Sequence, residues 1–258
     1  MTNFVPLNKA LHAAKSWRRP ADYAFASSEA LAPVVGLEVA AAAVNMPLAF
    51  VRNDRLVQLV AVTGLQSGTN LFVGKDGRWV GAYVPGILRS FPFRLARVEG
   101  REDMALCVAE EYVGDDGDPL YDDAGNLSSG VKQTVSFLEA YEKSRQQMTF
   151  AAAALSDAGV LTPWQIKVKA KDGQERAVAG LLRVDEKALN ALDEAAFAKL
   201  RKVAALPIAY AQLLSMSRLE VLSRLAEFHA RVAGAAPGTP GREVNLDFLR
   251  EDDGSLVF

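Results

Sequence analysis

Residues 114–130 divide the chain into two parts with different patterns, and this division constrains the fold more than any other feature of the sequence. Before residue 114, apolar residues come in short runs of strand length, separated by Gly, Pro and polar residues. After residue 130, apolar residues recur at helical spacing through several long segments. Strands followed by helices, rather than strands alternating with helices, indicate an α+β protein.

Two segments place an Asp-Gly pair between strand-like arms and therefore predict antiparallel β-hairpins. Residues 69–84 turn at 76–77, and residues 164–185 turn at 172–173. Glycine tolerates the positive φ angle that a tight hairpin turn requires. Further strands are predicted at 22–26, 47–51, 56–64, 92–98 and 104–113.

A long helix is predicted over residues 131–158, ending at Gly159. Asp185 and Asp193 each precede a helical pattern and are predicted to cap it. The other helices are predicted at 37–46, after each of these caps, and at 207–232, where an apolar stripe runs through Tyr210, Leu214, Val221, Leu225 and Phe228. The expected fold is α+β, with antiparallel hairpins forming a mixed sheet and long C-terminal helices packed against it.

The charge balance and the N-terminus exclude several classes of protein. The chain has 29 basic and 31 acidic side chains, a formal net charge of −2, which argues against a dedicated nucleic-acid binder. Its most basic run, KSWRRP at 15–20, is too short to change that conclusion. No signal peptide is recognisable, and Glu38, Asn45 and Pro47 interrupt the most apolar region, so no membrane span is expected. We expect a soluble cytoplasmic protein.

The usual catalytic and metal-binding motifs are absent from the sequence. There is no nucleophile elbow, phosphate loop or dinucleotide fingerprint, and the only histidines are His12 and His229. The single cysteine, Cys107, sits in an apolar run and is predicted to be a buried hydrophobe. The acidic loop at 115–126 lacks the spacing of a calcium-binding loop, so a solvated turn is expected there. We expect no metal and no cofactor; whether the protein is an enzyme stays open, with the missing motifs favouring a non-enzyme.

The stretch GRWVGAYVPGILRSFPFRL, residues 77–95, is the strongest candidate for a binding site. Arginine guanidinium groups stack on aromatic faces, and Trp and Tyr add polar tips, a combination suited to a peptide or an aromatic ligand. Its candidate binding residues are Arg78, Trp79, Tyr83, Arg89 and Arg94. In the alternative, the aromatic rings fill the core and the arginines face solvent.

The order of several motifs resembles that of the SapC-like family. The run NLFVGKDGRWVGAYVPGILRSFPFRL is followed by the acidic GDPLYDDAGN and then by VKQTVSFLEAY. The segment LLRVDEKALNALDEAAFAKLRKVAALPIAYAQLLSMSRLEVLSRL extends the resemblance to about residue 225. The resemblance implies one domain at 1–232, with a β-rich part at 1–113 and a helix-rich part at 131–232, followed by a tail at 233–258.

The resemblance also implies a biological setting. Proteins similar to this one tend to be encoded in Gram-negative bacteria beside TonB-dependent outer-membrane receptors, halogenase-like proteins and cupin-like proteins. That setting implies a part in nutrient uptake or in modifying a peptide or protein, without established catalytic residues. The positions that match family landmarks are Gly77, Arg78, Trp79, Tyr83, Pro92, Phe93, Asp122, Asp123, Tyr210 and Leu213.

Three functions are therefore compatible with the sequence. The first is an accessory protein that binds a partner protein, a peptide or a small ligand through the candidates above, together with Asp122, Asp123 and Tyr210. The second is a peptide- or protein-modifying enzyme in which Asp122, Asp123 and Tyr83 perform acid–base chemistry. The third is a structural subunit whose last helix pairs with another chain; a homo-oligomer is also compatible with the sequence.

Overall fold

The structure is a computed structural model that describes residues 2–53, 56–97, 104–169 and 175–234. Its strands are β1 (Phe4–Pro6), β2 (Ser16–Trp17), β3 (Leu31–Pro33), β4 (Leu48–Asn53), β5 (Leu56–Val62), β6 (Phe93–Arg97), β7 (Met104–Ala109), β8 (Val113–Gly114), β9 (Asp118–Pro119), β10 (Leu161–Pro163), β11 (Ile166–Lys169), β12 (Glu175–Val178) and β13 (Leu181–Val184). Its α-helices are α1 (Lys9–His12), α2 (Val39–Asn45), α3 (Gly86–Arg89), α4 (Ser129–Asp157), α5 (Glu186–Asn190), α6 (Glu194–Lys202), α7 (Ala205–Ser215) and α8 (Leu219–Gly234). Short 3-10 helices are η1 (Ala24–Ala26), η2 (Gly36–Glu38), η3 (Glu110–Tyr112) and η4 (Met216–Arg218).

The predicted α+β class is confirmed, and every strand pair in the described part of the chain is antiparallel. The strands form separate sheets rather than one. The largest has the order β10-β13-β4-β5-β3, and a second has the order β1-β7-β6. The remaining strands make the small sheet β8-β2-β9 and the hairpin β11-β12.

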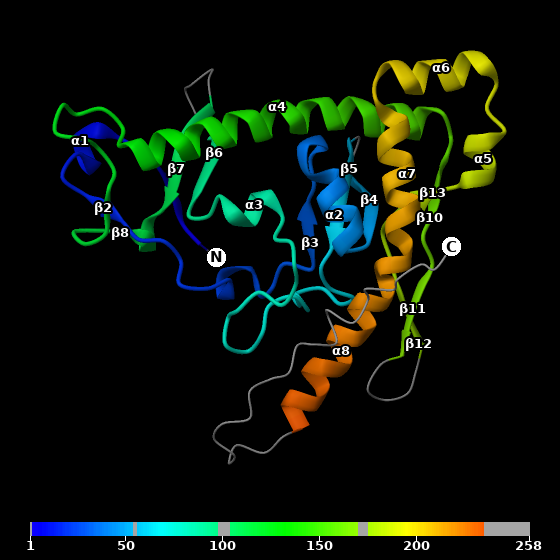
Figure 1. The fold of residues 1–258 in the computed structure, drawn as a ribbon, viewed down its shortest axis with the longest axis horizontal. Helices are drawn as coiled ribbons and strands as arrows, with labels where there is room; N and C mark the ends of the chain where they lie inside the picture. The colour runs from blue at the N-terminus through cyan, green and yellow to red at the C-terminus, as the bar shows by residue number, and fades with distance from the viewer. Residues whose placement is uncertain (1, 54–55, 98–103, 170–174, 235–258) are drawn as a thin grey trace, which may run out of the picture.

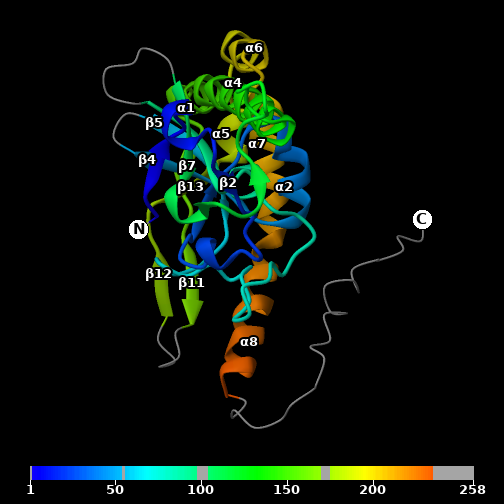
Figure 2. The ribbon, with the colours of Figure 1, turned by 90° about the vertical axis from the view of Figure 1, so that its left-hand side faces the viewer.

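The larger core forms around β4, whose residues Leu48, Ala49 and Phe50 are buried on both faces of the sheet. Consecutive buried side chains of this kind are typical of a central strand covered on both sides. Helices α2 and α7 pack against each other on one side of this sheet (Figure 2). The Ala-rich sequence of α2 suits this close approach, because its buried residues Ala42 and Ala43 have only small side chains.

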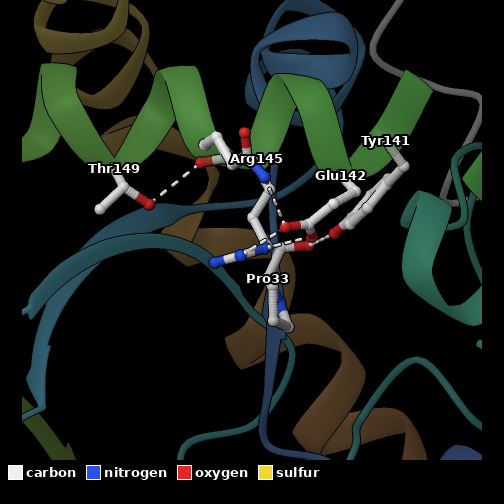
Figure 3. Close-up of polar contacts among 6 residues, drawn as sticks. Pro33, Tyr141, Glu142, Arg145 and Thr149 are labelled. Atoms are coloured by element: carbon white, nitrogen blue, oxygen red, sulfur yellow. Dashed lines mark hydrogen bonds and ion pairs between the residues drawn. The ribbon is translucent and has the colours of Figure 1, made fainter. Parts of the chain in front are cut away.

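Helix α4 connects the two larger sheets. It runs along one end of the molecule and contacts both β5 and β6 (Figure 1). Its first half packs Val131 and Leu138 into the core beneath the second sheet, and its second half packs Met148 into the larger core. Between the two halves, the Tyr141 hydroxyl donates to the Pro33 carbonyl at 3.1 Å, which ties the helix to β3 (Figure 3).

A buried amide fixes α7 to the largest sheet. The Gln212 side chain donates to the Leu48 carbonyl at 3.1 Å and accepts from the Val184 N–H at 2.9 Å. The Ser215 hydroxyl accepts from the Leu48 N–H at 2.9 Å. These contacts provide partners for backbone groups at the ends of β4 and β13, where unpaired buried groups would be unfavourable.

Two short elements differ from their predictions. Residues 22–26 were expected to form a strand, but the Asp22 carboxylate accepts from the Ala24 N–H at 2.9 Å and starts η1 instead. The hairpin predicted at 69–84 reduces to its turn and a single bridge between Val73 and Trp79. Its arms do not join a sheet, because the buried Asn70 side chain donates to the Ala26 carbonyl and holds the segment against η1.

The last helix is broken, and the predicted apolar stripe on it is wrong in its first half. Helix α7 ends at Ser215, and η4 separates it from α8. The Ser215 and Ser217 hydroxyls donate to carbonyls three residues earlier, a bond that competes with regular helix geometry. Tyr210 and Leu214 consequently lie on the solvent side, with exposed fractions of 41% and 76%, while Leu225 is buried.

The strand predicted at 104–113 ends at Ala109, where η3 begins, and several other local predictions agree with the structure. The hairpin β11-β12 forms where it was predicted, although its turn lies outside the described residues. Asp185 and Asp193 cap α5 and α6 by accepting backbone N–H groups. Gly159 follows α4 with a φ of 70°, a left-handed conformation that favours glycine. The tail lies outside the described residues from 235 onward.

Candidate functional site

A groove of about 700 Å³ lies between three segments that are far apart in the sequence. One wall is formed by residues 17–25, and the second by residues 88–93 at the end of α3 and the start of β6. The third is formed by residues 130–137 in the first turns of α4. The groove therefore lies where the N-terminal segment crosses the stretch that the sequence pattern singled out.

Six aromatic residues are among those that line the groove. The rings of Phe25 and Phe91 stack in parallel, with their centroids 3.9 Å apart and their planes 9° apart. Trp17 packs edge-on against Phe93 with a centroid distance of 4.8 Å. Parallel and edge-on ring pairs are stabilising beyond their buried area. Trp17 and Phe93 are themselves buried in the core beneath the second sheet, so the ring surface open to a ligand comes from the half-buried Phe25 and Phe91.

Two arginines place cations beside these rings. The Arg89 guanidinium lies 5.5 Å from the centroid of the Phe137 ring and 5.8 Å from that of Tyr83, and its Nε donates to the Val84 carbonyl. The Arg19 guanidinium lies 5.5 Å from the centroid of the Trp17 ring. Asp22 is the single carboxylate among the described lining residues, and it accepts from the Ala24 N–H. These lining residues carry a formal net charge of +1, and the Arg19 guanidinium is partly offset by an ion pair with Asp118 at 3.8 Å, outside the lining.

The Trp17 indole supplies a hydrogen-bond donor without an acceptor. Its Nε1 is buried, and no described residue accepts from it. A buried donor without a partner is unfavourable by about 1–3 kcal/mol. Trp17 is also one of the residues that line the groove, so a ligand bound there should change the surroundings of this indole.

A buried carboxylate, Glu38, holds the second wall in place. Its Oε2 accepts from the Tyr83 hydroxyl and from the Gly86 N–H, both at 2.6 Å. Its Oε1 accepts from the Val35 N–H at 3.2 Å. These bonds connect η2, the loop before α3 and the first residue of α3. Glu38 therefore fixes the start of the short helix that carries Arg89 at its other end.

The same contact changes the acidity of Tyr83. Burial, together with the hydrogen bond to Glu38 and the nearby carboxylate charge, raises the pKa of Tyr83 to about 12, while Arg89 acts in the opposite direction. Burial also raises the pKa of Tyr141, which lies near Glu38 and Tyr83. Both hydroxyls are therefore protonated at neutral pH.

The raised pKa of Tyr83 predicts that the protein loses stability at high pH. The folded state favours the neutral hydroxyl, so this contribution is complete below the ordinary pKa of 10.0 and is lost as the pH rises through about 12. Tyr83→Phe cannot ionise and should show a smaller loss between about pH 8 and about pH 11. Urea unfolding at both pH values measures the difference; an equal loss in both proteins contradicts the assignment.

The structure brings some of the predicted site residues together. Arg89 lines the groove and contacts Tyr83, and the half-buried Trp79 donates from its indole N–H to the Tyr83 carbonyl at 2.9 Å. Arg94 lies outside the groove lining, with its guanidinium 3.8 Å from the centroid of Phe4. Arg78 is exposed and forms a 3.6 Å ion pair with Asp76 at the turn.

The remaining candidates lie elsewhere. Asp122 and Asp123 are exposed in the acidic loop, where the Asp122 carboxylate accepts from the Asn126 N–H at 2.8 Å and pairs with Lys132 at 3.8 Å. This is the self-bonded turn that the sequence predicted. Tyr210 is on the exposed side of α7. The described groove includes neither of these aspartates, nor Tyr83 or Tyr210.

Several residues of the groove were missed by sequence reasoning. Trp17 and Arg19 belong to the basic run at 15–20, which was considered only as a nucleic-acid signal. Phe25 lies in a segment predicted to be a strand, and Phe137 lies in the predicted long helix. Glu38, which supports the groove without lining it, is predicted only to interrupt an apolar region. The one available signal was that KSWRRP repeats the arginine-aromatic combination of residues 77–95.

Other kinds of site find no support in the described part of the chain. It contains no group of three or more His, Cys, Asp or Glu residues arranged to hold a metal ion. Cys107 is buried, as predicted, and burial raises the pKa of its thiol. None of the described helices combines the length and the apolar character needed to span a membrane.

Comparison with known proteins identifies the family. Neither the curated proteins nor the solved structures contain a match to this chain. A family model described as SapC matches residues 7–222, which include every segment that lines the groove. Since this match extends over most of the sequence, the chain belongs to the SapC family.

Proposed function

We propose that the protein is an accessory factor that binds an acidic, aromatic peptide segment of a partner protein in the groove. The observation that carries this proposal is the combination, within one groove, of the stacked Phe25–Phe91 pair with the Arg19 and Arg89 cations. A phenylalanine side chain of the peptide would extend the ring stack. Its carboxylates would form charge-assisted hydrogen bonds with the guanidinium groups.

The placement of the candidate acid–base residues favours binding over catalysis. Asp122 and Asp123 are exposed and lie outside the groove lining, so they are not gathered with Tyr83. The Tyr83 hydroxyl donates to Glu38 and has a pKa of about 12, which makes it a poor general base at neutral pH. The proposed factor therefore has no chemistry of its own.

The setting implied by the family resemblance completes the proposal. We place the protein in the bacterial cytoplasm, in an uptake or peptide-modification system, with a halogenase-like, cupin-like or receptor-associated partner. Helix α4 packs against elements of both halves of the chain, which supports treating residues 1–232 as one domain.

A peptide titration followed by NMR tests the proposal. The probe is the blocked hexapeptide Gly-Phe-Asp-Glu-Phe-Gly, and the readout is the indole N–H signal of Trp17, assigned by its loss in Trp17→Phe. We expect a saturable shift of this signal because the indole lines the groove and lacks an acceptor. The indole of Trp164, which is buried in the other core, is the internal reference.

Two controls make the titration decisive. The peptide Gly-Phe-Lys-Lys-Phe-Gly keeps both rings and reverses the charge, so it should bind much more weakly to a groove with a positive lining. Equal binding of the two peptides, or a shift at Trp164 without one at Trp17, contradicts the proposal.

A further inference from the structure

We propose that residues 243–258 of this chain occupy the same groove in the absence of a partner, so that the chain's own C-terminal segment competes with the partner peptide. This inference rests on the proposed function of the groove. It is carried by the charge of the segment, by the point where helix α8 ends, and by the length of chain between that point and the segment.

The segment has the chemistry that the groove selects. It contains two phenylalanines, Phe248 and Phe258, and a single basic residue, Arg250. Against that arginine stand five acidic residues, which give a formal net charge of −4: Glu243, Asp247, Glu251, Asp252 and Asp253. The described groove lining carries two arginines and one aspartate. The aromatic rings and the negative charge of the segment therefore complement the rings and the arginines of the groove.

The end of α8 is connected to the edge of the groove by a short series of contacts. The Lys75 ammonium donates to the Val232 carbonyl at 3.4 Å, two residues before α8 ends at Gly234. Two residues beyond Lys75, the Gly77 carbonyl accepts from the Tyr23 N–H at 2.7 Å, and Tyr23 lines the groove. One lysine side chain and a few residues of backbone thus separate Val232 from the groove, a path of about 20–25 Å at full extension.

The intervening chain is long enough for this path. Residues 235–242 read AAPGTPGR, a Pro- and Gly-rich composition typical of linkers. Eight extended residues span up to about 26–29 Å, which exceeds the path from the end of α8 to the groove. The linker has to run nearly extended to span this path, as Pro-rich linkers do, and the attachment makes binding of the segment independent of protein concentration.

The segment also lies outside the family match. That match ends at residue 222, whereas the groove lies within it. The inference therefore concerns residues that the family model does not cover.

Time-resolved fluorescence anisotropy of the full chain tests the inference. A dye is attached to Ser255→Cys; Cys107 is 3% exposed, so it should not react in the folded protein. We expect the label to tumble mainly with the whole protein, at a rate independent of protein concentration. The double variant Arg19→Glu/Arg89→Glu should replace this slow decay by the nanosecond motion of a free terminus.

The matched control changes the same charge at the other end of the molecule. Lys199→Glu/Arg201→Glu alters two exposed residues of α6, which lies opposite α8 (Figure 1), and should leave the slow decay unchanged. Adding Asp252→Arg/Asp253→Arg to the groove variant should restore the slow decay by exchanging the charges. Circular dichroism of each variant verifies that it is folded.

Fast motion of the label in the parent chain overturns the inference, and so does slow motion that persists in Arg19→Glu/Arg89→Glu. Slow motion that depends on protein concentration also overturns it, because the segment would then bind to a second copy of the chain. Failure here is distinguishable from failure of the proposed function. If the C-terminal segment is free and the hexapeptide still shifts the Trp17 signal saturably, only the proposed competition is wrong. If the segment is free and the hexapeptide causes no shift, the groove is not a binding site and the proposed function is wrong as well.

Discussion

Replacing Glu38 by alanine should destabilise the protein by about 3–5 kcal/mol, because two buried backbone N–H groups and the Tyr83 hydroxyl lose their acceptor together. Such a loss is a large part of the stability of a typical domain. It is measured as the free energy of unfolding in urea at neutral pH. Glu38→Gln keeps an oxygen for one or two of these donors and should lose only about 1–2 kcal/mol.

Glu139→Ala is the matched control for this experiment. Glu139 is an exposed carboxylate on α4, and its removal should change the unfolding free energy by less than about 0.5 kcal/mol. If Glu38→Ala lowers the free energy of unfolding no more than Glu139→Ala does, the three hydrogen bonds to Glu38 do not stabilise the loop before α3. If Tyr83→Phe lowers the free energy of unfolding as much as Glu38→Ala does, the bond between Glu38 and the Tyr83 hydroxyl accounts for the whole effect.

Reversing the charge of Arg89 should weaken binding of the acidic hexapeptide by about 10- to 100-fold, the equivalent of one charge-assisted hydrogen bond with added repulsion. Arg89→Lys keeps the charge but loses the planar contact with the Phe137 and Tyr83 rings, so an intermediate loss is expected. The affinities come from the Trp17 titration, and thermal unfolding confirms that each variant is folded.

Arg78 provides the comparison within the same stretch of sequence. It is exposed, pairs with Asp76, and lies outside the described groove lining. Arg78→Glu should change the affinity less than twofold, apart from the long-range charge effect that salt screens. If Arg78→Glu weakens binding and Arg89→Glu does not, the site lies over the turn at 76–79 instead of in the groove.

Much of the fold follows from local patterns in the sequence. The strands β4, β5, β6 and β7 and the helices α2 and α4 lie where apolar spacing and breaker residues predict them. These elements are predictable because apolar residues repeat every two residues in strands and every 3.6 residues in helices, and because capping residues bond to nearby backbone groups. The broken helix at η4 and the single-bridge hairpin at 69–84 depend instead on Ser215, Ser217 and Asn70 bonding to the backbone.

The groove could not be predicted from local sequence patterns. Residues 77–95 supplied Arg89 and the stacking ring of Phe91, but the opposite wall comes from residues 17–25, more than 60 positions earlier in the chain. The arginine-aromatic composition that the two segments share does not place them side by side; only the folded chain brings Phe25 onto Phe91. Glu38 is equally hidden, because a carboxylate in an apolar helical run looks like a surface residue until its three donors are known.

Intermolecular NOEs between the hexapeptide and the protein test the central claim most directly. The account predicts contacts from the peptide's phenyl protons to the rings of Phe25 and Phe91, and from peptide protons to the Trp17 indole, since all three residues line one groove. Contacts confined to other surfaces, such as the turn at 76–79 or the exposed face of α7, would contradict it.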